Sequence, residues 1–192
     1  MKSDVNPIIR VSLLYCILSA SFSILGIFLA QKGATVTPIP PSAYTVQEIA
    51  GHIIWGLIAG AASLSLRYFI LSGSFAIFID SDHLIQLIPV ATVIRMSHSI
   101  SFGIISLVIM MLLFGKKDYL LGATVIGGLL AHLSYDTFNG KDGVFPIFTP
   151  FYNHMIIFPN IDWIFLEIAA VAVIGSVALL TTRTKNSLKS KA

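Results

Sequence analysis

Long apolar runs separated by short polar segments dominate the chain. Residues 11–30 hold no charged side chain over twenty positions, and as a helix they would extend about 30 Å, the thickness of a hydrocarbon core. Residues 161–181 form a second run of this kind, with Glu167 in its outer third. Runs of this length predict transmembrane helices. A cleaved signal peptide is the alternative for the first run, but Phe28, two residues before Ala30, is a poor cleavage-site residue.

Four shorter apolar runs lie between these two, at 49–66, 68–79, 99–114 and 119–135. The run at 68–79 is short for a span, so it either crosses a thinned bilayer or stops part-way as a re-entrant element. Pro-rich residues 31–45, the segment 84–96 and the polar, aromatic segment 137–160 are expected at the membrane surface or in water. The pattern therefore predicts an all-α polytopic bundle of about six passes.

Composition agrees with a membrane protein. Of the 192 residues, 56% are hydrophobic and 11% charged, against about 45–50% apolar and about 25% charged in soluble domains. These values exclude a soluble enzyme, a disordered chain and a nucleic-acid-binding domain. We expect one membrane domain over residues 1–192, with a metal-site core at 49–150 and a basic tail at 183–192.

The basic residues predict the orientation of the bundle. Six passes place nine of the twelve Lys and Arg residues on the side of both termini and three on the other side. Because cytoplasmic loops are enriched in Lys and Arg, the termini are expected in the cytoplasm, with 31–48, 80–97 and 137–160 outside. The three outer cations are Lys32, Arg95 and Lys141.

This topology brings imidazoles and carboxylates to the outer membrane level. Ionisable groups within spans cost about 2.5–3.5 kcal/mol each on insertion scales, so a cluster of them indicates a functional site. The i, i+4 spacing of His132 and Asp136 places both on one helix face. Taken one at a time, each has a simpler interpretation. Asp80–His83 could be a polar turn, His132 and Asp136 a hydrogen-bonded pair that connects helices, and His52 and His98 interfacial histidines. The candidate metal ligands are His52, Asp80, Asp82, His83, His98, His132 and Asp136.

Nitrogen and oxygen donors of this kind suit a divalent metal: zinc, with manganese or iron as alternatives. Three carboxylates with four neutral imidazoles carry a charge of −3, so one divalent ion leaves −1 and two leave +1. Metal-activated water makes hydrolysis the economical reaction, with Asp82 and then Asp136 as candidate general bases. No G-x-S-x-G, H-E-x-x-H or Walker sequence offers a rival arrangement.

The order Gly51-His52, Asp80-x-Asp82-His83, Ser97-His98-Ser99 and His132-x3-Asp136 resembles the YdjM-like family of predicted membrane-bound metal-dependent hydrolases. The resemblance covers about residues 50–150 and implies that the seven residues above are metal ligands or metal-activated acid–base groups. Two positions depart from the family pattern. Ile79 replaces a Pro, and the H-R-G of the third motif is Val93-Ile94-Arg95.

We therefore expect a multi-pass cell-membrane hydrolase that acts on a lipid or membrane-proximal ester or phosphoester, with membrane lipid as its partner and no nucleic acid. One rival is a proton or metal-ion transporter that uses the same cluster, and another is a non-catalytic metal-binding factor. Residues Asn153, His154 and Asp162 are explained equally well by loop solvation, and Glu167 by a protonated carboxyl.

Overall fold

The computed structural model describes residues 2–29, 45–87, 90–140, 142–152 and 154–189. Over these residues the chain is mainly helical, with one antiparallel pair of strands, which confirms the expected all-α class. The elements are α1 (Lys2–Leu29), α2 (Val46–Ala61), α3 (Leu66–Phe78), the 3₁₀ helix η2 (Ile79–Leu87), α4 (Ile100–Phe114), α5 (Tyr119–Asn139), β1 (Asp142–Phe145), β2 (Ile156–Pro159) and α6 (Asp162–Lys189). The expectations for residues 31–44, Lys141, Asn153 and 190–192 lie outside the described residues.

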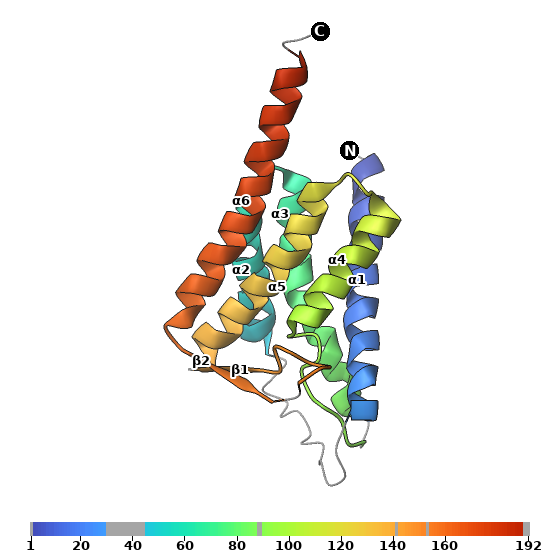
Figure 1. Ribbon diagram of the computed structural model, residues 1–192, viewed down its shortest axis with the longest axis vertical. Helices are drawn as coiled ribbons and strands as arrows, with labels where there is room; N and C mark the ends of the chain where they lie inside the picture. Colours follow the sequence, from blue (N-terminus) through green and yellow to red (C-terminus); the bar gives the residue numbers. More distant parts are fainter. Residues whose placement is uncertain (1, 30–44, 88–89, 141, 153, 190–192) are drawn as a thin grey trace.

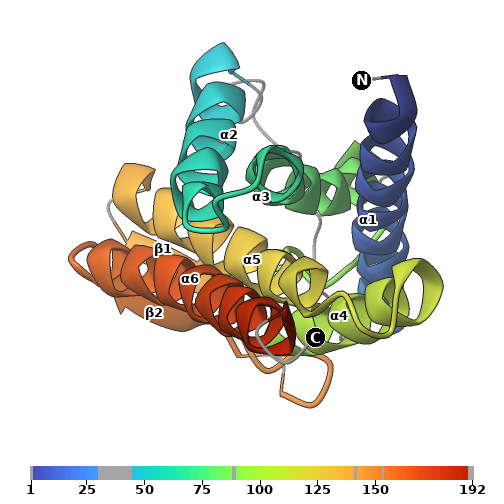
Figure 2. The same ribbon diagram turned by 90° about the horizontal axis from the view of Figure 1, so that it is seen from above.

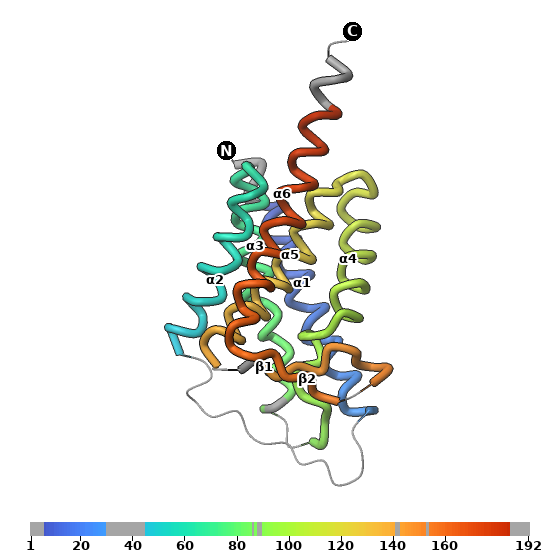
Figure 3. The backbone as a smooth tube through the Cα atoms, turned by 60° about the vertical axis from the view of Figure 1, so that its left-hand side comes forward, coloured from blue at the N-terminus to red at the C-terminus, as the bar shows by residue number. Residues whose placement is uncertain are grey.

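The helices lie along the long axis of the molecule and alternate in direction (Figure 1). Both chain ends lie at one end of the bundle, while β1, β2 and the first turns of α2 and α4 lie at the other, as Figure 3 also shows. The strands pair Asp142 with Pro159 and Phe145 with Ile156. This small sheet lies within 137–160, a segment expected only to be a loop.

Helix α5 forms the centre of the bundle, where it contacts α2, α3, α4 and α6 (Figure 2). Its glycines allow this close approach. A Cβ at Gly127 would lie 2.5 Å from Cδ1 of Ile174 on α6, and one at Gly128 would lie 2.8 Å from Cβ of Phe75 on α3. Small residues therefore let α5 pack closely against α6 and α3.

Helices α2 and α3 form a tightly packed hairpin. A Cβ at Gly56 would lie 2.5 Å from the carbonyl oxygen of Ser72 and 2.7 Å from Cβ of Ala76, so the α2–α3 contact requires glycine there. The hairpin turns at residues 62–65, where Leu64 has a φ of 53°. The expected span at 49–66 therefore begins and ends earlier, because the chain has already reversed direction before residue 66.

Among the residues that the structure describes, two helical stretches are long and apolar enough to cross a membrane, Asn6–Leu29 in α1 and Asp162–Thr184 in α6. Helix α3 has 13 residues and is about 20 Å long, which agrees with the short element expected at 68–79. On α4, large apolar side chains point away from the bundle, including Ile104 (54% exposed), Val108 (50%) and Leu112 (58%). Such a face is typical of contact with lipid rather than water.

Candidate metal centre

His52 enters the site from the beginning of α2. The Thr45 hydroxyl caps this helix by accepting a hydrogen bond from the Glu48 amide, so the second turn of the helix carries His52. The imidazole is 2% exposed and stacks on His132 with ring centroids 4.1 Å apart. Its Nε2 lies 3.2 Å from Oδ2 of Asp80 and 3.3 Å from Oδ1 of Asp136.

The segment that carries Asp80, Asp82 and His83 follows α3 directly as the 3₁₀ helix η2. Helix α1 holds this segment in place. The Ser19 hydroxyl donates to the carbonyl of Ile79 at 2.6 Å, and the Ser81 hydroxyl donates to the carbonyl of Cys16 at 2.8 Å. The first apolar helix therefore supports the site although it contributes no ligand.

His98 lies immediately before α4, next to the helix-capping Ser99. Its Nδ1 is 3.2 Å from Oδ2 of Asp82, and the same oxygen accepts a hydrogen bond from the Ser97 amide. An ionised carboxylate only accepts hydrogen bonds, so Nδ1 of His98 carries a proton. The arrangement points Nε2 of His98 toward the centre of the cluster, away from Asp82.

His132 comes from the penultimate turn of α5 and is fully buried. Its Nδ1 donates to the backbone carbonyl of Ala76 at 2.6 Å, because a carbonyl oxygen offers no proton. The other nitrogen, Nε2, therefore presents a lone pair. It lies 2.8 Å from Nε2 of His98.

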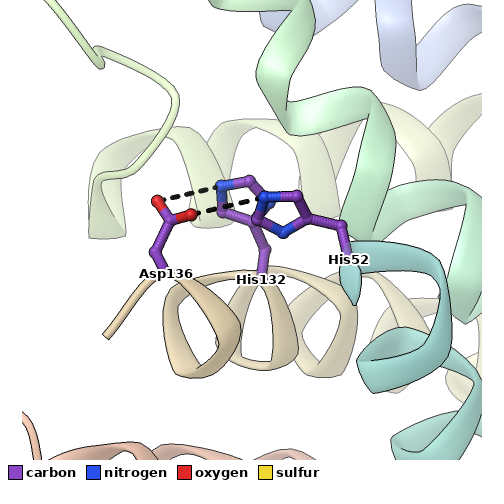
Figure 4. A group of neighbouring side chains, drawn as sticks. All are labelled: His52, His132 and Asp136. Atoms are coloured by element: carbon purple, nitrogen blue, oxygen red, sulfur yellow. Dashed lines mark ion pairs between the residues drawn. The ribbon is translucent and has the colours of Figure 1, made fainter. Parts of the chain in front are cut away.

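Two carboxylates complete the centre. Nε2 of His98 and Nε2 of His132 lie 3.4 and 3.6 Å from Oδ2 of Asp136. From Oδ1 of Asp80, Nε2 of His98 lies 3.9 Å away and Nε2 of His132 lies 3.6 Å away. Figure 4 shows His52, His132 and Asp136 directed at one another from α2 and α5. Two imidazole nitrogens and two carboxylates face one small volume, and either a proton shared by the imidazoles or a metal ion offsets their repulsion, so these residues fit a metal ion.

The described residues contain two overlapping ligand groups: His52, His132 and Asp136, and Asp80, His98 and His132. In each group the donor atoms lie within 4.8 Å of one another. Both groups use the same nitrogen of His132. An imidazole nitrogen has one lone pair, so His132 serves one ion at a time.

The electrostatics of the cluster favour positive charge at its centre. Burial acts to raise the pKa of Asp80 and Asp82, but the surrounding imidazoles together, including hydrogen bonds from His83 to Asp80 and from His98 to Asp82, outweigh it, and both pKa values lie below the usual range. Burial acts to lower the pKa of His98, but Asp82 outweighs it and raises the pKa of this imidazole. A metal ion provides the same compensation for the carboxylates as a proton on His98 does.

The structure brings five of the seven predicted ligands to this centre: His52, Asp80, His98, His132 and Asp136. His83 lies at the rim, with Nε2 3.3 Å from Oδ1 of Asp80. Asp82 lies behind His98 and is in contact with its Nδ1 instead of the converging nitrogens.

Three further residues considered from the sequence lie outside the ligand groups. His154 is exposed and stacks on Tyr152, Asp162 begins α6, and Glu167 lies half-buried on α6. None of the three is placed to bind the same ion.

Several contacts that shape the centre carried no recognisable signal in the sequence. The carbonyl of Ala76 and the amide of Ser97 are backbone groups, which every residue has. Ser19 is one of several serines in an apolar helix. Arg95 was identified as an outer cation, but its contact with Asp136, at 3.5 Å, required the fold.

No family model, no curated protein and no solved structure matches this chain. The function proposed below therefore depends on the geometry and chemistry of the chain's own residues. The contacts of His98 and His132 are the most informative of these.

Proposed function

We propose that the protein is a membrane-bound metal-dependent hydrolase. The observation that supports this proposal most directly is that His98 and His132 each donate a proton through Nδ1, to Asp82 and Ala76, and present Nε2 to the same point. This is how metal-ligating histidines are held, with the second nitrogen fixed by a carboxylate or a backbone carbonyl.

The ligands in this proposal are His52, Asp80, His98, His132 and Asp136. Imidazole and carboxylate donors favour zinc, with manganese and iron as alternatives. A divalent ion held there would lower the pKa of a water molecule and stabilise the negative charge that develops on an ester oxygen. The shared nitrogen of His132 is compatible with one ion, or with two ions of which His132 binds one.

The two candidate bases have different surroundings. Asp82 has a fully buried side chain whose Oδ2 contacts His98, so in this proposal it positions His98. Asp136 faces the converging nitrogens and its side chain is 10% exposed, so it is the better placed of the two to accept a proton from water. His83 lies beside Asp80 at the rim of the centre.

The surroundings of the site support a membrane-proximal substrate. The connection between β1 and β2 carries exposed aromatic side chains, Phe148 (49%), Phe151 (90%) and Tyr152 (54%), at the same end of the bundle as the centre. Aromatic residues of this kind are enriched at the membrane–water interface. A substrate whose apolar part stays in lipid would reach the site from this surface.

The alternating helices and the common end for both termini support a six-pass arrangement with cytoplasmic termini and an outward-facing site. The six proposed passes include four helices besides the two that are long and apolar enough to span a membrane by themselves. The distribution of Lys and Arg residues predicts the orientation of the bundle in the membrane.

The backbone at Arg95 is unusual for a residue other than glycine. Arg95 stands where that pattern has the glycine of H-R-G, and it adopts a φ of 58°. Glycine adopts this left-handed conformation freely, whereas other residues rarely do. A glycine at this position, as in the YdjM-like pattern, would adopt this backbone without strain.

The test is hydrolysis by purified protein loaded with zinc or manganese, against a panel of lipid esters and phosphoesters. We expect turnover that disappears with a chelator and returns with the metal. A metal-loaded protein that hydrolyses no member of the panel, while reconstituted vesicles pass protons or divalent ions, would replace the hydrolase with the transporter.

A further inference from the structure

An arginine lies directly beside the proposed metal centre. Nη2 of Arg95 is 3.5 Å from Oδ2 of Asp136, the oxygen that also faces His98 and His132. Nη1 donates to the carbonyl of Val144 at 3.4 Å. The guanidinium also lies over the ring of Phe145, 5.6 Å from its centroid. One carbonyl, one carboxylate and one ring therefore fix the direction of the side chain.

The backbone of Arg95 has a strained, left-handed conformation that helps to place its side chain beside the centre. Its φ of 58° starts a turn in which the His98 amide donates to the Arg95 carbonyl at 3.0 Å. The same turn therefore delivers His98 and the guanidinium to the centre together. Left-handed backbone at a residue other than glycine costs energy, and such strain concentrates at functional sites.

Arg95 is also on the open side of the centre. Its side chain is 31% exposed and that of Asp80 is 22% exposed, whereas the side chains of His98 and Asp82 are fully buried. A ligand that enters from solvent therefore meets Arg95 and Asp80 before the imidazoles. A guanidinium has five N–H donors, and within the described part of the chain the contacts with Val144 and Asp136 leave donors for such a ligand.

The charge of the site with two ions bound is compatible with an anionic ligand. Three carboxylates and Arg95 sum to −2, so two divalent ions bring the site to +2 and one brings it to zero. The dianion of a phosphate monoester neutralises the two-ion site. A carboxylic ester carries no charge before it reacts, so it offers the guanidinium no anion to bind in the ground state.

We infer that Arg95 is the substrate-recognition residue of the centre and that the substrate is a phosphate ester. Arginine presents paired N–H donors that match the oxygens of a phosphoryl group. In this arrangement Arg95 holds one non-bridging oxygen while the metal centre holds another. The inference rests on the proposed hydrolase function and specifies its substrate class.

The test compares binding of inorganic phosphate to metal-loaded protein by calorimetry, in the wild type and in Arg95→Gly. Glycine suits the left-handed backbone, so this variant should fold and keep its metal content. We expect its affinity for phosphate to fall about tenfold to hundredfold, as for the loss of a hydrogen bond between charged groups. Arg95→Lys keeps the charge without the paired donors and should lie between the two.

A matched control is Arg67→Gln on α3, which removes another guanidinium. The guanidinium of Arg67 pairs with the carboxylate of Asp118 at 3.9 Å. The phosphate affinity of this variant should equal that of the wild type. Equal phosphate affinity in Arg95→Gly and wild type, with metal bound in both, would overturn the inference and leave the hydrolase proposal standing. Acetate bound as tightly as phosphate would overturn the phosphoester assignment in favour of a carboxylic ester. A wild type that takes up no metal would instead overturn the proposed function.

Discussion

The Nε2 atoms of His98 and His132 lie 2.8 Å apart, although His98 precedes α4, His132 lies on α5, and 34 positions separate them. Nδ1 of His98 donates to Asp82, and Nδ1 of His132 donates to the carbonyl of Ala76. Two nitrogens at this distance either share a proton in a hydrogen bond or bind one metal ion from the same side. Asp80 and Asp136 face the same volume, so the group could hold a metal ion that also neutralises two carboxylates.

The position of Asp82 behind His98 leads to the first prediction. Asp82→Asn keeps the size of the side chain but removes the negative charge that fixes the His98 ring. Loss of such a partner typically lowers metal affinity about 10- to 100-fold without removing a ligand. Competition against a chelator of known affinity measures the change.

Metal stoichiometry separates the two roles of Asp82. If Asp82→Asn binds fewer ions per chain even at saturating metal, then Asp82 is a ligand, as its sequence pattern allows. Unchanged affinity would show that Asp82 does not orient His98. His154→Ala, which alters an exposed imidazole outside the ligand groups, is the control and should match the wild type.

A second prediction concerns the α2–α3 contact. Alanine is a better helix former than glycine by about 1 kcal/mol, but a Cβ at Gly56 would lie 2.5 Å from the carbonyl oxygen of Ser72. Gly56→Ala should therefore destabilise the protein by about 1–3 kcal/mol through overpacking. Thermal unfolding in detergent measures the loss.

The matched control for Gly56→Ala is Gly175→Ala on α6. There a Cβ would lie 3.5 Å from Cβ of Ala62, an ordinary van der Waals contact. This variant should be as stable as the wild type or more stable. If both variants gained stability, α2 and α3 would not be packed as closely as the structure indicates.

The third prediction is the membrane topology. Reporter fusions after Leu64, Lys117 and the C-terminus should report the cytoplasm, and a fusion after Gly140 should report the outside. The reason is the excess of Lys and Arg on the side of the termini, together with the alternating directions of the helices. An external C-terminus would contradict both the six-pass arrangement and the outward orientation of the site.

A fourth prediction is that the metal stabilises the folded protein. Free metal at 100 times its Kd adds about 2.7 kcal/mol to the free energy of unfolding when it binds only the folded state. Removal with a chelator should therefore lower the unfolding temperature of the wild type. The same treatment should leave His132→Ala nearly unchanged, and a decrease of equal size in both would show that the chelator acts elsewhere.

Much of the fold follows from the apolar runs. The all-helical class and the short element near 68–79 were predicted because runs of apolar residues with few charges leave little alternative to helix in a membrane. The boundaries were less predictable. The turn at 62–65 lies inside one apolar run, and the β1–β2 pair lies in a segment dominated by Gly, Pro and aromatic residues.

The ligand set was predictable because imidazoles and carboxylates are rare in apolar helices and fell at one level of the expected topology. The roles within the set were not. Asp82 and Asp80 are two residues apart and chemically identical, and only the path of η2 decides which carboxylate faces the centre and which faces Nδ1 of His98. The proton on His132 depends on the carbonyl of Ala76, which has no signature in the sequence.

The most direct test of the metal centre is elemental analysis of protein purified without chelator, in the wild type, His132→Ala and His154→Ala, with folding checked in each. The account predicts at least one divalent transition-metal ion per chain in the wild type and in His154→Ala, and a loss of at least one ion in His132→Ala. A folded wild type without metal, or equal metal content in all three proteins, would contradict it.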